Sequence, residues 1–268
     1  MKYGLLGYPL GHSMSPVIHK ALLRSLEINA EYDLYPTPPE KLTERVPALL
    51  SMDGFNVTIP YKTEIIKFLD GVEGYAERYG SVNTVAMKAG RNIGYNTDCI
   101  GFLRALTAEG IPFEGNILLL GAGGAGRVIA YLAAEQGLPL TIAARDTAKA
   151  KLLADEIESK IGKSPIEITG FDTTGEFDLI INSTPVGVFP KINECPVFDE
   201  QIKRCKYAYD LVYNPKETLF MKKAKDFGLK TAGGLSMLVF QAVASEEIWH
   251  NCKISDETAN NIIENLVI

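Results

Sequence analysis

The sequence predicts an α/β protein of two domains, each built on a mostly parallel sheet. Short runs of aromatic and β-branched residues alternate with helical patterns along the 268 residues, and a glycine-rich turn separates a strand from a helix near the middle of the chain. Strand–helix alternation is typical of βαβ units with right-handed crossovers. A chain of this length accommodates one large domain or two ordinary ones, and either can bury a sizeable core.

The first half of the chain begins with a strand followed by a helix. Runs punctuated by Gly or Pro predict strands over 2–7, 31–37, 54–60 and 81–87. Between the first two strands, Ile18, Leu22 and Leu26 lie on one face of a predicted helix that runs from Pro16 to Leu26. Ser15 suits the N-cap of this helix, and Pro16 suits its first position.

A glycine-rich turn in the middle of the chain is the most informative motif. The apolar run Ile117–Leu120 predicts a buried strand, and Gly121, Gly123 and Gly126 follow it at GxGxxG spacing as an apolar helical pattern begins. The first glycine permits a tight turn, the second lets the backbone approach a pyrophosphate, and the third lets helix and strand pack closely. The helix N-terminus then presents free N–H groups to phosphates. We therefore expect a Rossmann domain that binds a dinucleotide, although the same pattern alone also marks tight turns.

The second half continues the alternation. Strands are predicted over 139–145, 166–171, 178–184, 207–213 and 229–233. Helices are predicted over 147–160, 216–227 and 234–249, and from Ser255 to the end of the chain. We expect an N-terminal α/β substrate domain from residues 1–98 together with 236–268, and a doubly wound parallel-sheet cofactor domain from residues 99–235. Ligands of such sheets bind outside the carboxyl ends of the strands.

Composition excludes several classes of function. The formal net charge of -6 and the pI near 5.3 argue against a nucleic-acid surface. No apolar run is long enough to span a bilayer, and no signal-peptide pattern begins the chain, so we expect a cytoplasmic protein with no membrane partner. The four cysteines show no CxxC spacing, which favours reduced thiols. No metal site is expected, because His12, His19 and His250 lack ligand spacing with acids or cysteines.

Two pairs of polar residues in the predicted first domain suggest a ligand site. Ser13 and Ser15 stand near a helix N-terminus, where hydroxyl groups and the helix dipole can hold a carboxylate, although an ordinary cap and turn explain them equally well. Asn56 and Thr58 alternate with apolar residues, so both are expected on the same side of one strand.

Three further residues can likewise be interpreted either as part of a ligand site or as ordinary structural residues. Lys62 is by default a surface lysine of a loop. Asn83 falls inside a predicted strand, where a buried amide must find hydrogen-bond partners. Asp98 closes GYNTDCIGF and could simply cap the following helix.

Together these residues resemble a known family. The motifs GYPLGHSMSP, FNVTIPYK, GSVNTV, GYNTDCIGF, GAGGAGR and GGLSMLVFQA occur in the order and near-spacing of shikimate dehydrogenases. The resemblance runs from residue 4 to about residue 245, and several of its motifs lie outside the generic Rossmann core. It implies reversible, NADPH-dependent reduction of 3-dehydroshikimate to shikimate, a step in chorismate and aromatic amino-acid biosynthesis.

The resemblance also implies roles for individual residues. Lys62 and Asp98 match the catalytic pair, in which a protonated lysine in a closed site stabilises charge on the substrate oxygen and supplies a proton. Which of the two carries the transferred proton stays open. The matched substrate-binding residues are Ser13, Ser15, Asn56, Thr58, Asn83, Tyr213 and Gln241. Ser13 and Ser15 match the residues that hold the carboxylate, and the amides and hydroxyls match positions around the ring hydroxyls.

NADP is the expected cofactor, with NAD as an alternative. The matched cofactor-binding residues are Gly121, Ala122, Gly123, Gly124, Ala125, Gly126, Arg145, Lys149, Thr184 and Gly234. Arg145 and Lys149 can meet a 2′-phosphate, where an NAD-specific domain carries an acidic residue. The family's usual Asn-Arg-Thr reads Ala144-Arg145-Asp146 here, and Asp146 adds a like charge, which leaves relaxed specificity open.

Three rival functions remain. A quinate/shikimate dehydrogenase shares most of these motifs and can use NAD, although the serine pair favours shikimate. A methylenetetrahydrofolate dehydrogenase joins similar domains but leaves that serine pair unexplained. A non-catalytic nucleotide sensor would tend to lose Lys62 or Asp98, and this chain retains both. The expected oligomeric state is a monomer or a homodimer.

Overall fold

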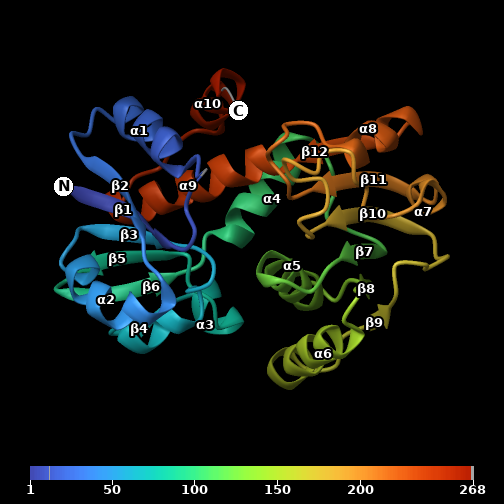
Figure 1. Cartoon of the computed structure of the whole chain (residues 1–268), viewed down its shortest axis with the longest axis horizontal. Helices are drawn as coiled ribbons and strands as arrows, with labels where there is room; N and C mark the ends of the chain where they lie inside the picture. The colour runs from blue at the N-terminus through green and yellow to red at the C-terminus, as the bar shows by residue number, and fades with distance from the viewer. Residues whose placement is uncertain (12, 267–268) are drawn as a thin grey trace. The chain divides into compact units, whose positions relative to one another are not determined.

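The computed structural model describes residues 1–11 and 13–266 and divides into two compact units (Figure 1). The first comprises Met1–Gly101 and Val239–Leu266, and the second comprises Phe102–Leu238. Two helices continue from one unit into the other: α4 (Asp98–Ala108) and α9 (Gly234–His250). His12 and the last two residues of the predicted C-terminal helix lie outside the described residues.

The first unit contains a mixed six-stranded sheet. Its strands lie in the order β2 (Glu31–Pro36), β1 (Lys2–Gly7), β3 (Gly54–Val57), β5 (Thr84–Lys88), β6 (Arg91–Tyr95) and β4 (Gly71–Val72). The expectation of a mostly parallel sheet is wrong for the β3–β5–β6 part, because β5 runs antiparallel to both neighbours. The antiparallel pair β5–β6 is closed by Ala89 and Gly90, both at positive φ, as in a two-residue type I′ hairpin turn.

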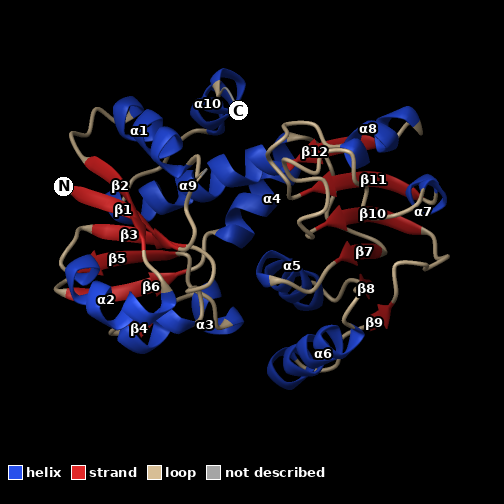
Figure 2. Cartoon of the chain, viewed as in Figure 1, coloured by secondary structure: helices blue, strands red, loops and turns tan. Residues whose placement is uncertain are grey.

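Helices cover the sheet of the first unit (Figure 2). They are α1 (Ser15–Ser25), α2 (Leu42–Leu50), α3 (Tyr75–Tyr79), α10 (Asp256–Asn265) and part of α9, with the short 3₁₀ helices η1 (Pro39–Lys41) and η2 (Glu64–Phe68). In α1 the predicted apolar face is confirmed, since Ile18 and Leu22 are fully buried. The predicted cap is wrong: Met14 occupies the N-cap position, and Ser15 is already helical. The backbone N–H of Ser15 donates instead to Ser13 Oγ at 3.3 Å.

The second unit contains a six-stranded, fully parallel sheet. Its strands lie in the order β12 (Lys230–Gly233), β11 (Cys205–Asp210), β10 (Phe177–Asn182), β7 (Ile117–Leu120), β8 (Leu140–Ala143) and β9 (Ile166–Thr169). Counted from β7 as the first strand, this is the 3-2-1-4-5-6 order of the Rossmann fold. The predicted Rossmann sheet is therefore confirmed, and its order reverses between β7 and β10.

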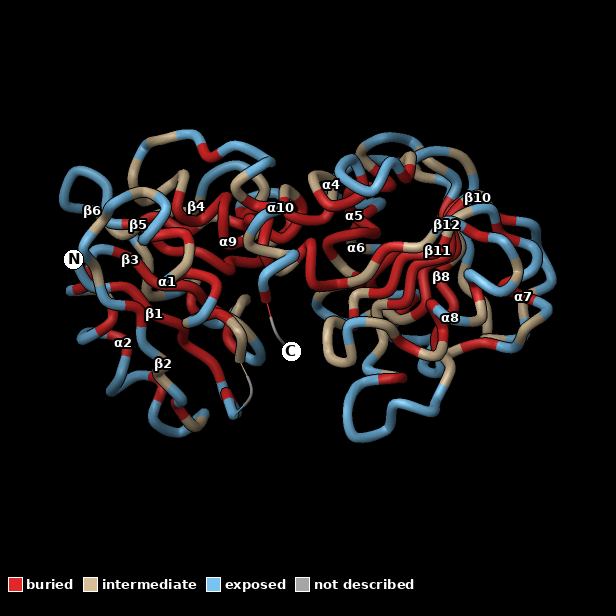
Figure 3. The backbone as a smooth tube through the Cα atoms, turned by 90° about the horizontal axis from the view of Figure 1, so that it is seen from above, coloured by how far each residue is buried: buried red, intermediate tan, exposed pale blue. Residues whose placement is uncertain are grey.

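Helices connect β7 to β8, β8 to β9, β10 to β11 and β11 to β12, whereas β9 leads to β10 without a helix. The helices are α5 (Gly124–Glu135), α6 (Thr147–Ile161), α7 (Asp199–Lys203) and α8 (Leu219–Asp226). Figure 3 shows the central strands of this sheet in the colour of buried residues, and all four residues of β7 are fully buried. Such continuous apolar strands are what a parallel sheet covered on both faces demands.

Three predicted strands are shorter than the sequence pattern indicated. β3 ends at Val57, so Thr58 lies just beyond it; Asn83 lies just before β5; and Tyr213 follows the end of β11. Backbone pairing still holds the first two in place. Thr58 N–H donates to Leu6 O at 2.8 Å, and Val57 N–H donates to Asn83 O at 2.8 Å. Thr58, Asn83 and Tyr213 therefore stand beyond strand ends, whereas Asn56 lies within β3.

Candidate active site

Lys62 and Asp98 are in direct contact in the first unit. Lys62 lies in the segment between β3 and η2, and Asp98 is the first residue of α4. Lys62 Nζ donates to Asp98 Oδ2 at 2.6 Å, and the two side chains are 23% and 10% exposed. A charge-assisted hydrogen bond of this length, largely screened from water, orients the ammonium group strongly. Lys62 is thus held by a carboxylate instead of extending into solvent.

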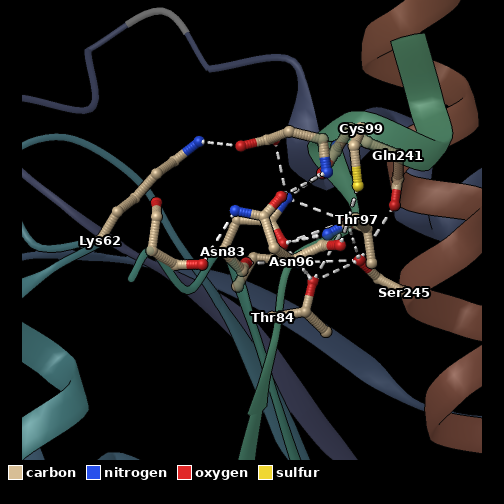
Figure 4. Close-up of polar contacts among 11 residues, drawn as sticks. Lys62, Asn83, Thr84, Asn96, Thr97, Cys99, Gln241 and Ser245 are labelled. Carbon is tan, nitrogen blue, oxygen red and sulfur yellow. Dashed lines mark hydrogen bonds and ion pairs between the residues drawn. The ribbon is translucent and has the colours of Figure 1, made fainter. Parts of the chain in front are cut away.

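The amide of Asn83 fixes the other side of this carboxylate (Figure 4). Asn83 Nδ2 donates to Asp98 Oδ1 at 2.8 Å and to Thr97 Oγ1 at 2.9 Å. Asn83 Oδ1 accepts the backbone N–H of Thr97 at 2.7 Å. Because a backbone N–H can only donate, this contact determines which end of the amide faces Asp98. Both carboxylate oxygens of Asp98 therefore accept hydrogen bonds, one from Lys62 and one from Asn83.

The structure brings Asn56 and Gln241 to the same network. Asn56 Nδ2 donates to the backbone oxygen of Asn83 at 3.1 Å, and Asn56 Oδ1 accepts from the hydroxyl of Tyr32 at 2.8 Å. Gln241, on α9, lies with its Oε1 at 3.4 Å from Asn83 Nδ2. Burial raises the pKa of Tyr32 well above its ordinary value, so this phenol is a neutral hydrogen-bond donor.

The remaining predicted substrate residues of the first unit lie in segments next to β1 and β3. Ser13 is half-buried in the segment before α1, Ser15 is buried in the first turn of α1, and Thr58 is half-buried after β3. The residue that binds Asn56, Tyr32, belongs to β2, next to β1 in the sheet.

The glycine-rich turn of the second unit has the shape that phosphate binding requires. Gly121 has φ +98°, which favours glycine. A side chain at Gly126 would meet Gly121 O and Ser183 Oγ at 2.6 Å, so α5 can pack this closely only with glycine there. A side chain at Gly123 or Gly124 would meet nothing within 4 Å. The backbone at these two glycines is therefore open to a ligand at the N-terminus of α5.

A cavity of about 1250 Å³ extends from this turn within the second unit. Its lining includes Gly121, Ala122, Gly123, Arg145, Lys149 and Thr184, six of the predicted cofactor residues. Gly124 and Ala125 are the first two residues of α5. The glycine backbone and two cations fit the pyrophosphate and the 2′-phosphate of a dinucleotide.

Asp146 lies in the same cavity, between the two cations in sequence. It is the N-cap of α6, and its Oδ1 accepts the backbone N–H of Lys149 at 2.9 Å. A carboxylate thus occupies the first turn of α6, where an anion would otherwise be favoured.

A buried carboxylate, which the sequence analysis did not single out, supports the segment that contains Thr184. Thr184 donates through its N–H and its hydroxyl to Asn182 Oδ1, at 3.0 and 2.6 Å. Asn182 Nδ2 in turn donates to Asp210 Oδ1 at 2.9 Å, and the Thr218 hydroxyl donates to Asp210 Oδ2 at 2.6 Å. Burial raises the pKa of Asp210 to about 6 despite these bonds. An Asn and an Asp at neighbouring strand ends are the only sequence signal for this pair.

The last two predicted residues also belong to the second unit. Tyr213 is half-buried beyond β11, and burial raises the pKa of its phenol. Gly234 is the first residue of α9, and a side chain there would collide with the backbone carbonyl of Leu211. Gly234 is therefore required by packing whatever its contact with a ligand.

The described residues, 1–11 and 13–266, contain no group of three or more His, Cys, Asp or Glu side chains arranged to hold a metal ion. In the same residues, no helix combines the length and the apolar character needed to cross a membrane.

The fold and the site define a dinucleotide-dependent oxidoreductase. A Rossmann sheet carries an open glycine-rich turn, and the other unit carries a lysine held by a carboxylate. Residues 5–85 match the family model for the shikimate dehydrogenase substrate binding domain. The chain belongs to the shikimate dehydrogenase family.

Individual relatives match this chain over nearly its full length. Shikimate dehydrogenase (NADP(+)) of Methanococcus maripaludis is 43% identical over 256 residues, covering 93% of this chain and 92% of that protein. A crystal structure of a shikimate dehydrogenase in complex with NADP+ superimposes with a TM-score of 0.91 at 38% identity, covering 98% of this chain and 94% of that one. The Thermus thermophilus enzyme in complex with NADP(H) and shikimate gives a TM-score of 0.89 at 35% identity, covering 98% of both chains.

The raised pKa of Asp210 predicts a pH-dependent stability. The folded protein holds a proton at Asp210 up to about pH 6, whereas the unfolded chain releases it near the ordinary pKa of 3.8. The contribution of this group to the free energy of unfolding is therefore complete below about pH 4 and is lost as the pH rises through about 6. Asp210→Asn keeps an acceptor oxygen and does not titrate.

Urea unfolding of the wild type and of Asp210→Asn, between pH 5 and pH 8, measures this contribution. We expect the difference in unfolding free energy, wild type minus variant, to fall by on the order of 1 kcal/mol between pH 5 and 7 and then level off. A difference that stays constant over this range would contradict the assignment.

Proposed function

We propose that this protein catalyses the reversible, NADPH-dependent reduction of 3-dehydroshikimate to shikimate. The observation that carries the proposal is the contact between Lys62 and Asp98, with the carboxylate fixed from the other side by Asn83. This arrangement lies in a unit whose residues 5–85 match a shikimate dehydrogenase substrate binding domain.

Lys62 acts as the proton donor in the direction of reduction. As a hydride reaches the ketone carbon, the C=O π electrons move to oxygen, and the negative charge that builds there is stabilised by the ammonium group. Transfer of one proton from Nζ to this oxygen completes the alcohol, and solvent restores the proton to the lysine. In the direction of oxidation the neutral amine accepts the hydroxyl proton.

Asp98 keeps the side chain of Lys62 oriented between turnovers. Its Oδ2 accepts from Nζ at 2.6 Å, while its Oδ1 is occupied by Asn83. A carboxylate fixed on both sides has little freedom to follow the lysine, so the ammonium group is positioned by the fold. This division makes Lys62 the group that exchanges the proton and Asp98 the group that orients it.

The polar residues around the pair are assigned to the substrate. Ser13 and Ser15, at the start of α1, hold the carboxylate of the substrate. Asn56, Thr58, Asn83 and Gln241 bind its ring hydroxyls, with Tyr213 as a further contact. Sites built from such groups discriminate strongly, because an analogue that lacks a hydroxyl leaves a buried polar group unpaired.

The second unit is assigned to NADP. The open backbone at Gly123 and Gly124, at the N-terminus of α5, receives the pyrophosphate, and Arg145 and Lys149 face the 2′-phosphate. Gly121, Ala122, Ala125 and Gly126 shape the turn, and Thr184 and Gly234 border the bound cofactor. When bound, NADPH supplies the hydride of the reaction.

A steady-state assay of the purified protein tests the proposal. Reduction of the nicotinamide is followed with shikimate and with quinate, each in the presence of NADP+ and of NAD+. Fast turnover confined to shikimate and NADP+ supports the proposed reaction. Comparable turnover with quinate or NAD+ assigns the protein to the broader-specificity quinate/shikimate dehydrogenases, and turnover with none of the four combinations would overturn the proposal.

Lys62→Ala tests the assignment of the proton donor. We expect turnover with shikimate and NADP+ to fall by about a hundredfold or more, because the reaction loses its proton donor and acceptor. The affinity for NADP+, measured by fluorescence titration, should change little. Lys67→Ala is the matched control, since Lys67 is 60% exposed and paired with Glu64. Near-normal turnover of Lys62→Ala would contradict the mechanism.

A second candidate function differs in cofactor use. Asp146 places a negative charge in the cavity beside Arg145 and Lys149, and its carboxylate already accepts an N–H at the start of α6. A 2′-phosphate there gains attraction from two cations and suffers repulsion from one anion, whereas the 2′-hydroxyl of NAD lacks both effects. This balance favours an enzyme that uses NAD as well as NADP.

The substitution Asp146→Asn removes the negative charge but keeps the N-cap of α6, because Asn caps helices about as well as Asp. We expect the variant to bind NADP+ about threefold to tenfold more tightly, through loss of the like charge, with NAD+ affinity nearly unchanged. Isothermal titration calorimetry with NADP+ and NAD+ measures both values. Equal changes for the two cofactors would show that Asp146 does not distinguish them.

The state of the cysteines bears on the cellular compartment of the protein. The four cysteines are free thiols, and two of them are buried, which suits a reducing compartment. We therefore assign the protein to the cytoplasm, acting on small molecules as a monomer or a homodimer.

A further inference from the structure

Two buried hydroxyl groups lie behind the active site and have no part in the proposed chemistry. Thr84 is the first residue of β5, directly after Asn83, and Ser245 lies one helical turn beyond Gln241 on α9. Both residues are fully buried. Figure 4 shows them on the far side of Asn83 from Lys62.

These hydroxyls form a continuous hydrogen-bonded chain to Asn83. Ser245 Oγ lies 2.8 Å from Thr84 Oγ1, and the Thr84 hydroxyl donates to Asn83 Oδ1 at 3.0 Å. Asn56 Nδ2 donates to both hydroxyl oxygens, at 3.0 Å to Ser245 and 3.1 Å to Thr84. The chain therefore connects α9 to the amide that binds Asp98.

The direction of each hydrogen bond follows from groups that can act in one sense only. Tyr32 donates to Asn56 Oδ1, so the NH₂ group of Asn56 faces the two hydroxyls, whose oxygens accept from it. The Thr84 hydroxyl can then donate to Asn83 Oδ1. The Ser245 hydroxyl donates to Thr84 Oγ1 or, at 3.0 Å, to the backbone oxygen of Gln241. Each hydroxyl carries one hydrogen, and the NH₂ group of Asn56 carries two, which it shares among the two hydroxyl oxygens and Asn83 O.

These hydrogen bonds also determine which oxygen of Asp98 is left for Lys62. With Asn83 Oδ1 held by the Thr97 N–H and the Thr84 hydroxyl, the Asn83 NH₂ group points at Asp98 Oδ1. That contact leaves Asp98 Oδ2 to Lys62. The Thr97 hydroxyl, at 3.2 Å, is a third and longer contact of this oxygen. If Asn83 lost the Thr84 hydroxyl in this buried site, the amide would turn more freely and the carboxylate would follow.

We propose that Thr84 is a positioning residue of the reaction. Its hydroxyl orients Asp98 and Lys62 through the amide of Asn83, and Ser245 holds the Thr84 side chain in place. The proposal rests on the proposed roles of Lys62 and Asp98. Thr84 contacts neither of these two side chains and is not itself catalytic.

Thr84→Val and Thr84→Ser form the matched pair that tests this role. Valine has nearly the shape of threonine but no hydroxyl, whereas serine keeps the hydroxyl and loses only a methyl group. We expect Thr84→Val to lower kcat with shikimate and NADP+ on the order of tenfold, with KM for NADP+ and the NADP+ affinity unchanged. Thr84→Ser should recover most of kcat. A purely structural role would instead make kcat follow the loss of thermal stability in both variants.

Crystal structures of the two variants give a readout that does not depend on activity. The proposal requires the 2.8 Å contact between Asn83 Nδ2 and Asp98 Oδ1 to be lost or lengthened in Thr84→Val and kept in Thr84→Ser. An unchanged contact in Thr84→Val would overturn the proposal, as would a wild-type kcat in that variant. Absence of shikimate oxidation by the wild type would instead refute the proposed function, and the crystal structures would still decide the role of Thr84 in orienting Asp98.

Discussion

The amide of Asn83 is the constraint on which the candidate active site depends. Its oxygen accepts the backbone N–H of Thr97, and its nitrogen therefore faces Asp98 and the Thr97 hydroxyl. An amide buried in this way must be satisfied at both ends, since each unpaired polar group costs about 1–3 kcal/mol. The fold supplies these partners from the end of β6, the start of β5 and α9, so the orientation of Asp98 and Lys62 is built into the packing of the first unit.

The two units use strand ends in different ways. In the second unit, the carboxyl ends of parallel strands meet at the reversal of strand order between β7 and β10, and backbone groups of the glycine-rich turn are open there. In the first unit, side chains from β3, β5 and α9 form a hydrogen-bond network, and Asn56 and Asn83 lie at the centre of this network. One unit therefore offers backbone donors suited to phosphate, and the other offers fixed side chains suited to a polyol acid and to proton transfer.

The sequence predicted much of the fold and part of the site. The doubly wound parallel sheet of the second unit followed from alternation and the glycine motif, because each βαβ unit is a local pattern. The strand β6 was not predicted, since its hairpin turn is Ala89–Gly90 rather than a stronger turn pair such as Asn-Gly. Lys62 and Asp98 were assigned by family resemblance and not by spacing. Thr84 and Ser245 gave no signal, because they are far apart in sequence and a buried Ser or Thr looks like any other polar residue of a helix or strand.

A double-mutant cycle on Lys62 and Asp98 tests the central claim most directly, namely that the two residues act as one unit. Turnover with shikimate and NADP+ is measured for Lys62→Ala, Asp98→Asn and the double variant. The account predicts that the double variant loses no more turnover than the more damaged single variant, because removal of either residue already disables the pair. Losses that multiply in the double variant would show that Lys62 and Asp98 contribute independently, and would contradict the account.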